Sequence, residues 1–384
     1  IRRTITMSKI DELINKYCPE GVEWNSVGEV CDVVTGGEAP ENCIKSSVPN
    51  DKYKFPIFAN GSEVYGFTDK FKINKDAVTI SSIGANTGTI YFRKAFFTPI
   101  IRLKVLLPKK ENLYAKYIFY FLSSITIYSK KSSVPNLNAD DVKKIPIPIP
   151  PLPIQEEIVK ILDSFTELEQ ELEQELELRK KQYEYYRNNL LTFGDDVERK
   201  TLGEVCERTK GTPITAQQMA VINKSGSPIK IFAGGKTVAY VDYGDIPDKD
   251  VLTKESIVVK SRGIIGFEYI NTPFSHKNEF WSYHSNNNKI KIKYVYYYLK
   301  NKENYFNFIG EKMSKMPQLS IPDTEKFSIP IPSLSEQERI VTILDKFDAL
   351  VNDISIGLPA EIEARRKQYE YYRDKLLTFK KQES

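Results

Sequence analysis

A stretch of about 40 residues occurs twice in the chain, and this duplication constrains the fold more than any other feature. The first copy, residues 154–193, reads IQEEIVKILDSFTELEQELEQELELRKKQYEYYRNNLLTF. The second copy begins SEQERIVTILDKF and ends RRKQYEYYRDKLLTF at Phe379. An Ile-Pro ladder precedes each copy, at 147–150 and at 329–332. Proline removes a backbone donor and favours an extended chain, so each ladder is predicted to be a stiff lead into a helix.

Apolar residues in both copies recur in alternating steps of three and four, which predicts a coiled-coil seam. In the first copy a step of four after Leu172 marks a stutter, which unwinds a coiled coil locally but keeps the same face. The predicted helix-pairing or partner-binding residues are Ile158, Phe165, Leu172, Tyr183, Tyr186 and Leu190 in the first copy, and Ile340, Phe347, Ile354, Tyr369, Tyr372 and Leu376 in the second.

The second copy carries four extra residues, close to Gly357 and Pro359. A proline ring clashes with the carbonyl four residues earlier, so a kink or break is predicted there. Two long helices with matching seams most simply pack on each other within one chain. The alternatives are that each seam docks on its own domain, or that the seams drive homodimerisation.

The segments before the two helices also repeat each other in order. The openings VGEVC (27–31) and LGEVC (202–206), the runs FANG (58–61) and FAGG (232–235), and PNL (135–137) and PQL (317–319) correspond. Short strand-like runs separated by Gly and Asn turns, with a few helices beside them, indicate α+β domains and not alternating βαβ units. The chain is therefore interpreted as a tandem duplication of one globular domain followed by one long helix.

Composition narrows the class of protein. No apolar run approaches the ~20 residues of a membrane span. Four cysteines without CxxC spacing and only two histidines argue against a zinc site and for a reducing, cytoplasmic setting. The globular segments carry an excess of Lys and Arg, whereas the first long helix is acidic, so a polyanion would be drawn to the domains. Residues 1–6, which precede Met7, are expected to be an addition upstream of the natural start.

Motifs for catalysis are missing from the sequence. It contains no GxxxxGK[ST] loop, no GxGxxG after a strand and no supported Ser-His-Asp or Cys-His arrangement. The glycine-rich run 84–88 lies between predicted strands and is interpreted as a hairpin turn. His276 and His284 are interpreted as turn or surface residues and not as metal ligands. The chain is therefore predicted not to be an enzyme, with no metal and no cofactor of its own.

Polar and basic loop residues remain, and these suit nucleic acid. Lys and Arg neutralise phosphates, while Asn, Gln and Arg pair with base edges in the major groove. The DNA-binding candidates are Asn60, Ser62, Ser81, Ser82, Asn86, Thr87, Arg93, Lys94, Lys130 and Lys131 in the first domain, and Lys236, Thr237, Lys260, Arg262, Lys277, Asn278, Lys312, Lys315 and Gln318 in the second. The alternative for each single residue is ordinary surface polarity.

Together, the paired blocks IPIPPLPIQEEIVKILDSF and IPIPSLSEQERIVTILDKF, the PNL and PQL runs and the twin YEYYR ends resemble the specificity (S) subunit of type I restriction-modification systems. The resemblance covers the chain from Met7. The first copy departs from the family's usual Glu-Gln pair at one place: it has Ile154-Gln155 where the second copy has Glu336-Gln337. The resemblance implies target recognition domains at 7–146 and 194–328, a ladder with the central long helix at 147–193, and a ladder with the C-terminal long helix at 329–384.

The same resemblance implies an antiparallel, pseudo-two-fold helix pair that spaces two domains over a bipartite double-stranded DNA site. The implied partners are modification (methyltransferase) subunits, two in number, which bind S-adenosylmethionine, and restriction subunits. It also implies that the N-terminal segment packs near the C-terminal helix. A helix of about 40 residues spans about 60 Å, more than the ~34 Å turn of a duplex. The competing hypothesis is a coiled-coil adaptor without sequence-specific DNA binding; a fused restriction enzyme is disfavoured because its motifs are missing.

Overall fold

The computed structural model describes residues 2–127, 136–235, 237–312 and 316–382, and the side chains from Lys9 onward. Contacts divide the chain into two units, each assembled around one domain. Unit 1 comprises Ile1–Glu173 and Ile362–Ser384, and unit 2 comprises Gln174–Glu361. The boundary passes through the long helix α5 (Leu152–Leu190), so each unit holds one globular domain and pieces of both repeated helices. No helix in the described part of the chain is long and apolar enough to cross a membrane.

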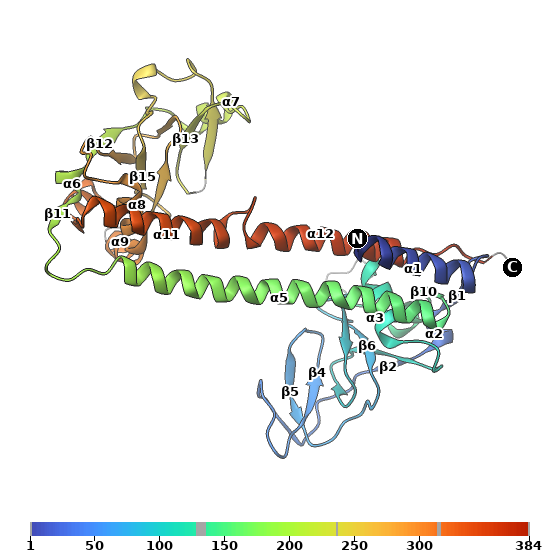
Figure 1. Ribbon diagram of the computed structural model, residues 1–384. Coiled ribbons are helices and arrows are strands. Elements are labelled where there is room, and N and C mark those ends of the chain that lie inside the picture. Colours follow the sequence, from blue (N-terminus) through green and yellow to red (C-terminus); the bar gives the residue numbers. More distant parts are fainter. Residues whose placement is uncertain (1, 128–135, 236, 313–315, 383–384) are drawn as a thin grey trace. The chain divides into compact units, whose positions relative to one another are not determined.

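The domain of unit 1 contains a four-stranded antiparallel sheet with the order β2-β9-β6-β7 and a second sheet with the order β3-β5-β4-β8. Figure 1 labels β2 and β6 of the first sheet and β4 and β5 of the second. In the second sheet β4 and β8 run parallel. The elements are α1 (Arg2–Tyr17), β1 (Glu23–Ser26), α2 (Val27–Val30), β2 (Cys31–Thr35), β3 (Cys43–Ile44), β4 (Phe55–Phe58), β5 (Val64–Thr68), β6 (Ala77–Ile80), β7 (Ile90–Arg93), β8 (Thr98–Pro99), β9 (Lys104–Pro108), α3 (Ala115–Ser124), α4 (Ala139–Lys143) and β10 (Pro146–Ile149).

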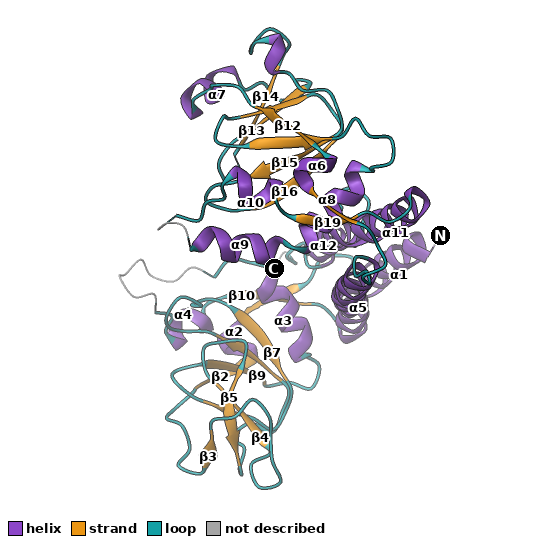
Figure 2. Ribbon diagram, turned by 90° about the vertical axis from the view of Figure 1, so that its left-hand side faces the viewer, coloured by secondary structure: helices purple, strands orange, loops and turns teal. Residues whose placement is uncertain are grey.

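Unit 2 repeats this topology. Its four-stranded sheet has the order β12-β18-β15-β16, and its second sheet has the order β14-β13-β17 with β13 and β17 parallel. The elements are β11 (Arg199–Thr201), α6 (Leu202–Val205), β12 (Glu207–Lys210), α7 (Ala216–Ile222), β13 (Ile229–Phe232), β14 (Val238–Val241), η1 (Asp248–Asp250), β15 (Ser256–Lys260), β16 (Gly266–Ile270), β17 (Phe274–His276), β18 (Trp281–His284), α8 (Ile292–Asn301), α9 (Glu303–Glu311), α10 (Ile321–Glu325) and β19 (Ser328–Pro330). The predicted duplicated α+β fold is confirmed, and Figure 2 shows the strands and helices of each domain.

The two proline ladders form strands, which the sequence pattern did not predict. Strand β10 pairs antiparallel with β1, from Glu23 opposite Ile149 to Ser26 opposite Pro146. Strand β19 pairs with β11 in the same way, with Lys200 opposite Ile329. Each pairing closes its domain, because the strand that opens the domain meets the strand that leaves it. Proline is tolerated in these two-stranded ribbons because its missing donor can face away from the partner strand.

A clamp of polar side chains fixes each domain to the start of its own long helix. In unit 1, Gln155 is fully buried; its Nε2 donates to the carbonyls of Asn112 (3.0 Å) and Pro150 (2.7 Å), and its Oε1 accepts from Tyr114 N (3.0 Å). About two helical turns further, Asp163 accepts from Lys116 Nζ of α3 at 2.7 Å. Tyr120 Oη donates to the same carboxylate, and Tyr117 Oη donates to Pro148 O at 2.9 Å.

Unit 2 holds the same clamp on helix α11 (Leu334–Asn352). Gln337 Nε2 donates to the carbonyls of Lys289 (3.0 Å) and Pro332 (2.9 Å), and its Oε1 accepts from Lys291 N (2.9 Å). Asp345 accepts from Lys293 Nζ (2.8 Å) and Tyr297 Oη (2.6 Å) of α8. The contact common to both repeats is therefore made by the glutamine of each pair, Gln155 or Gln337. The residue before it, Ile154 or Glu336, can differ.

The predicted packing of the two repeated helices on each other is confirmed within each unit. In unit 1, Phe165 of α5 stacks on Tyr372 of α12 (Leu358–Leu376) with ring centroids 5.4 Å apart. Arg366, earlier in α12, pairs with Glu169 (2.7 Å) and Glu173 (3.3 Å), later in α5, so the two segments run antiparallel. In unit 2 the same seam is aromatic: Phe347 of α11 stacks on Tyr183 (6.0 Å) and on Tyr186 (5.4 Å).

The N-terminal and C-terminal segments meet in unit 1, as predicted. Val22 N donates to Lys380 O (2.9 Å) and Gln382 N donates to Val22 O (3.0 Å), which forms a parallel bridge between Val22 and Lys381. Ile10 of α1 is buried in the same apolar core as Leu376 and Leu377.

The second repeated helix is broken between α11 and α12, at residues 353–357, as the position of Pro359 predicted. The Asp353 carboxylate accepts from Ser355 N (2.7 Å) and Ile356 N (3.3 Å), which turns the chain out of the helix. Gly357 closes the turn, because a Cβ there would lie 2.4 Å from Ala349 O. The prediction that Ile354 lies in the seam is therefore wrong: its side chain is in the turn and 85% exposed.

Alanine substitutions test this correction. Ile340 is fully buried in the core of unit 2, so Ile340→Ala is expected to lower the free energy of unfolding by about 2–5 kcal/mol. Ile354→Ala, the matched change at the exposed position, is expected to change it by less than about 0.5 kcal/mol. Urea unfolding curves of the two variants provide the measurement. A cost at Ile354 equal to that at Ile340 would show that α11 and α12 form one continuous seam.

Candidate nucleic-acid interface

Three of the predicted polar residues of the first domain meet behind the loop that follows β4. Asn60 Oδ1 accepts from Ser82 N (2.7 Å), and Ser81 Oγ donates to Asn60 O (2.7 Å). Asn60 Nδ2 reaches across to donate to Ile101 O at 2.6 Å. Ser81 and Ser82 are fully buried, so these hydroxyls hold the loops in place and are not presented to a ligand. The prediction that Ser81 and Ser82 contact DNA directly is corrected on this point.

Arg93 supports the same loop from inside the domain. Its guanidinium donates to Gly61 O (2.8 Å) and Ser62 O (2.9 Å) and lies 3.8 Å from the centroid of the Phe58 ring. Only 8% of the residue is exposed, and burial lowers the pKa of its guanidinium. A side chain enclosed by backbone carbonyls and an aromatic ring cannot also reach a phosphate, so Arg93 is likewise a supporting residue.

The other candidates of the first domain are more accessible. Asn86 and Thr87 lie on the turn between β6 and β7, where Ser81 N donates to Thr89 O (2.9 Å), which confirms the predicted hairpin. Ser62 is exposed on the loop after β4. Lys94 follows β7 and pairs with Asp76 at 3.2 Å. Their contacts with DNA stay a prediction, and Lys130 and Lys131 lie outside the described residues.

In the second domain, Arg262 and Gln318 lie opposite each other in an isolated antiparallel bridge, and both residues are exposed. Thr237 and Asn278 are also exposed, on the loops after β13 and β17. The lysine candidates have partners: Lys260 pairs with Glu268, Lys277 with Glu279 at 2.7 Å, and Lys312 lies 4.0 Å from the Phe308 ring. Lys236 and Lys315 lie outside the described residues.

One turn near these residues was not predicted from the sequence. In the first domain it contains Ile101 (φ 51°) and Arg102 (φ 58°), two consecutive residues in the left-handed region. Both residues are exposed. No sequence signal marks this turn, because neither isoleucine nor arginine favours that conformation and the turn contains no glycine.

Both histidines are buried, so the prediction that they are turn or surface residues is wrong. His276 is the last residue of β17 and has no exposed surface; Nδ1 lies 3.1 Å from Lys277 O and Nε2 lies 3.1 Å from Ser282 Oγ. His284 ends β18 and is 7% exposed. Both residues lie on strands instead, and all four residues of β18 are buried. Burial lowers the pKa of both imidazoles.

This burial predicts an acid-sensitive second unit. The folded-state pKa of His276 lies below its ordinary value of about 6.5, so below that pH the unfolded chain binds a proton that the folded chain does not. The free energy of unfolding of unit 2 is therefore expected to be fully present above about pH 6.5 and to fall as the pH is lowered to 5. Urea unfolding at several pH values measures this slope. His276→Asn is expected to flatten it, and an unchanged slope would contradict the assignment.

No three His, Cys, Asp or Glu residues in the described part of the chain are placed to hold a metal ion. Burial raises the pKa of the thiols of Cys31 and Cys206 to about 12, so neither is a thiolate nucleophile at neutral pH.

Aromatic side chains remain exposed on both repeated helices. Tyr183 (7% exposed) is buried in the seam, whereas its neighbours Tyr185 (64%) and Tyr186 (41%) are exposed. In the second copy Tyr371 is 63% exposed beside the seam residue Tyr372. Ile158 and Leu376 are buried, and Leu172, Leu190 and Tyr369 are half-buried. The helices thus keep aromatic surface that their mutual packing does not use.

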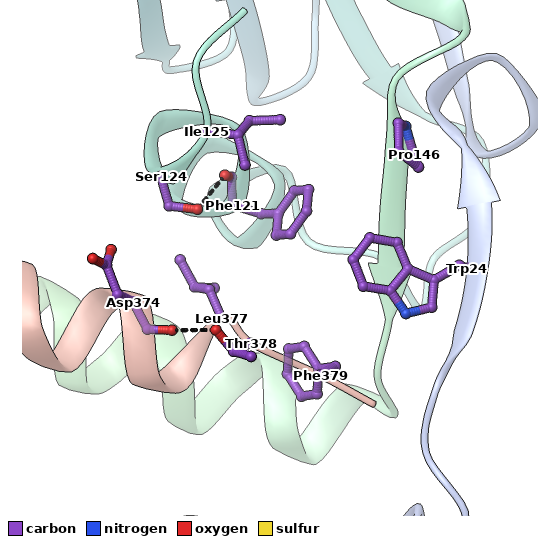
Figure 3. A pocket seen from close by; sticks show the side chains of 9 residues that line it. All are labelled: Trp24, Phe121, Ser124, Ile125, Pro146, Asp374, Leu377, Thr378 and Phe379. Atoms are coloured by element: carbon purple, nitrogen blue, oxygen red, sulfur yellow. Dashed lines mark hydrogen bonds between the residues drawn. The ribbon is translucent and has the colours of Figure 1, made fainter. Parts of the chain in front are cut away.

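A pocket of about 350 Å³ opens in unit 1 where the end of α12 meets the first domain (Figure 3). Trp24, Phe121, Leu377 and Phe379 supply an apolar lining, and Ser124 and Thr378 bond only to their own helices, at Phe121 O and Asp374 O.

Comparison with known proteins gives one consistent result. A family model described as "Type I restriction modification DNA specificity domain" matches twice, at residues 19–178 and 194–364. The "Type I restriction enzyme EcoR124I/EcoR124II specificity subunit" of Escherichia coli is 32% identical over 410 residues, which cover 98% of this chain and 98% of that relative. A putative type I restriction enzyme specificity subunit of Haemophilus influenzae is 30% identical and covers 93% of this chain and 96% of its own length.

The fold is also found among solved structures. The crystal structure of a type I restriction-modification system S subunit from M. genitalium matches with a TM-score of 0.66 and 19% identity. The match covers 93% of this chain and 96% of that one. At this identity the likeness concerns the fold alone, and it agrees with the duplicated topology described above.

Proposed function

The chain belongs to the family of type I restriction-modification specificity subunits, and from this premise we propose that its two domains each read one half of a bipartite DNA site. The observation that carries the proposal is the duplication itself. The two domains share one strand order and one clamp to a long helix, but their exposed loops carry different polar residues. A constant frame with variable loops is suited to two unlike half-sites, since bases are read by side chains at the groove.

The partners follow from the family. We propose that modification subunits, two in number, bind the repeated helices, and that the exposed Tyr185 and Tyr371 belong to that surface. Restriction subunits would join the same complex. Adenine methylation and S-adenosylmethionine would belong to the modification subunit, and this chain would contribute recognition without catalysis. Aromatic side chains that are exposed on a rigid helix are typical anchors of protein interfaces.

Methylome sequencing of a host that expresses this chain with its modification partner tests the proposal. The expected result is adenine methylation at a two-part motif. Exchanging residues 21–150 for the equivalent domain of a relative is expected to change one half of that motif and leave the other unchanged. If both halves change, or neither does, the modular assignment fails. Binding that is indifferent to DNA sequence at every salt concentration would favour the adaptor hypothesis.

A further inference from the structure

A turn with the same backbone frame occurs in both domains, directly after the parallel strand β8 or β17. In the first domain Ile100 N donates to Phe58 O (2.9 Å), and in the second Lys277 N donates to Phe232 O (3.0 Å). The turn then closes with the same bond, from Leu103 N to Ile100 O (3.2 Å) and from Phe280 N to Lys277 O (2.9 Å). Residues 100–103 and 277–280 therefore correspond one to one.

A buried serine holds the third residue of each turn. Ser82 Oγ donates to Arg102 O at 2.7 Å, and Ser261 Oγ donates to Glu279 O at 2.5 Å. Both serines lie just beyond the inner strand of a hairpin: Ser82 is the second residue after β6 and Ser261 is the first after β15. The correspondence places Arg102 of the first domain where the second domain has Glu279. The backbone of the turn is the same in both domains, but the side chain at its third position is positive in the first domain and negative in the second.

The first domain fixes this turn in a strained conformation. A β-branched residue such as Ile101 in the left-handed region costs on the order of 1–3 kcal/mol, and such strain persists only where the surroundings enforce it. Here Ile101 N donates to Gly37 O (2.7 Å), Arg102 N donates to Gly36 O (3.0 Å), and Asn60 Nδ2 donates to Ile101 O (2.6 Å). These bonds hold two exposed side chains, of Ile101 and Arg102, in a fixed direction.

Two further positions correspond beside each turn. Ile83 forms an isolated bridge with Asn136, and Arg262 forms the equivalent bridge with Gln318. A glycine with positive φ follows in each hairpin, Gly84 at 80° and Gly263 at 78°. We call the four corresponding positions the display set. It comprises Ile83, Ile101, Arg102 and Asn136 in the first domain, and Arg262, Asn278, Glu279 and Gln318 in the second.

The display set has the chemistry that reads base edges. Arginine pairs with guanine, asparagine and glutamine with adenine, glutamate accepts from cytosine, and an apolar side chain contacts the thymine methyl group. The guanidinium groups of Arg102 and Arg262 are exposed, and neither makes a hydrogen bond or ion pair with another described residue. In the first domain, Ile83, Ile101 and Arg102 also line one open groove of about 540 Å³ with Tyr65.

We propose that the display set determines DNA specificity, with Arg102 reading a guanine in one half-site and Arg262 reading a guanine in the other. The inference rests on the proposed function and deepens it. Within a single chain, the buried serine, the isolated antiparallel bridge and the turn bonds are the same in both domains, whereas all four display positions differ. A surface on which the backbone is constant and the side chains vary is what two domains with one fold and two targets require.

Methylome sequencing of Arg102→Ala and Arg262→Ala, each in the full chain with its modification partner, tests the inference. Each variant is expected to lose discrimination at one guanine position of its own half-site by about 5- to 150-fold, which corresponds to the 1–3 kcal/mol of a bidentate base contact. The other half-site is expected to stay unchanged. Arg102→Lys, which keeps the charge but loses the two-pronged geometry, is expected to relax the same position. Arg199→Ala is the matched control, because Arg199 is exposed on β11, outside the display set.

The outcomes separate the two proposals. A wild-type chain without a two-part methylated motif would overturn the proposed function. A wild-type motif that stays unchanged in both alanine variants would overturn only the display set. Uniform loss of methylation at every sequence would also overturn it, because that pattern marks a phosphate contact or a folding defect and not base reading. Thermal melting of the purified variants shows which of these two applies.

Discussion

Replacing Gln337 with leucine is expected to lower the free energy of unfolding of unit 2 by about 3–5 kcal/mol. The two side chains are similar in size, so the change acts through hydrogen bonds. It leaves the carbonyls of Lys289 and Pro332 and the N–H of Lys291 without their partner, around a glutamine side chain that has no exposed surface. Each buried polar group left unpaired costs about 1–3 kcal/mol. Urea unfolding, followed by the fluorescence of Trp281 in the same unit, measures the loss.

The duplication supplies a second test of the same clamp. Gln155→Leu is expected to have a similar effect on unit 1, because the three bonds recur there. Gln217→Leu, at an exposed position of α7, is the control and is expected to change stability by less than about 0.5 kcal/mol. A Gln337→Leu variant as stable as this control would show that the clamp is not needed to hold the domain on its helix.

Gly211→Ala is expected to destabilise the second domain more than the addition of a methyl group at any other position in it. A Cβ at this position would lie 1.8 Å from His276 O and 2.6 Å from its carbonyl carbon, so the backbone of β17 would have to move. The bridge between Thr212 and Lys277 lies next to this contact and anchors the turn 277–280. The expected cost is about 3–5 kcal/mol, together with loss of selectivity for one half-site, by the same methylome measurement.

Gly234→Ala is the matched control for this substitution. Gly234 lies on the loop after β13 in the same domain, has no atom within 4 Å of a built Cβ, and does not have positive φ. It is expected to leave stability within about 0.5 kcal/mol of the wild type. Equal stability of the two variants would show that β12 can move away from β17 without cost. The close approach of Gly211 to His276 would then not be what anchors the turn 277–280.

The sequence predicted those parts of the fold that depend on period and repetition. The seam through Ile158, Phe165 and Tyr183 follows from helical spacing, and the break before Pro359 follows from ring geometry. The α+β class and the duplicated domains follow from the order of the repeated runs. The prediction that Ile354 lies in the seam was wrong, because helical spacing does not reveal the turn at Asp353 that takes Ile354 out of the helix.

The candidate site was less predictable, since residue type gives hydrogen-bonding capacity but not the partner. Ser81, Ser82 and Arg93 have the chemistry of DNA contacts, yet in the fold their bonds go to backbone carbonyls. Ile101 and Arg102 were missed for the opposite reason. Their display depends on a backbone conformation that local preferences disfavour and that only distant segments enforce.

The discontinuous composition of unit 1 has a consequence for synthesis on the ribosome. Its core includes Leu376 and Leu377, and Val22 is bonded to Lys380, so the first domain lacks part of its interior until residues 376–380 emerge. Unit 2 is one continuous segment, 174–361, and has all its own residues earlier. Unit 2 is therefore expected to mature before unit 1, and a chain that stops before Leu376 would lack part of the core of the first domain.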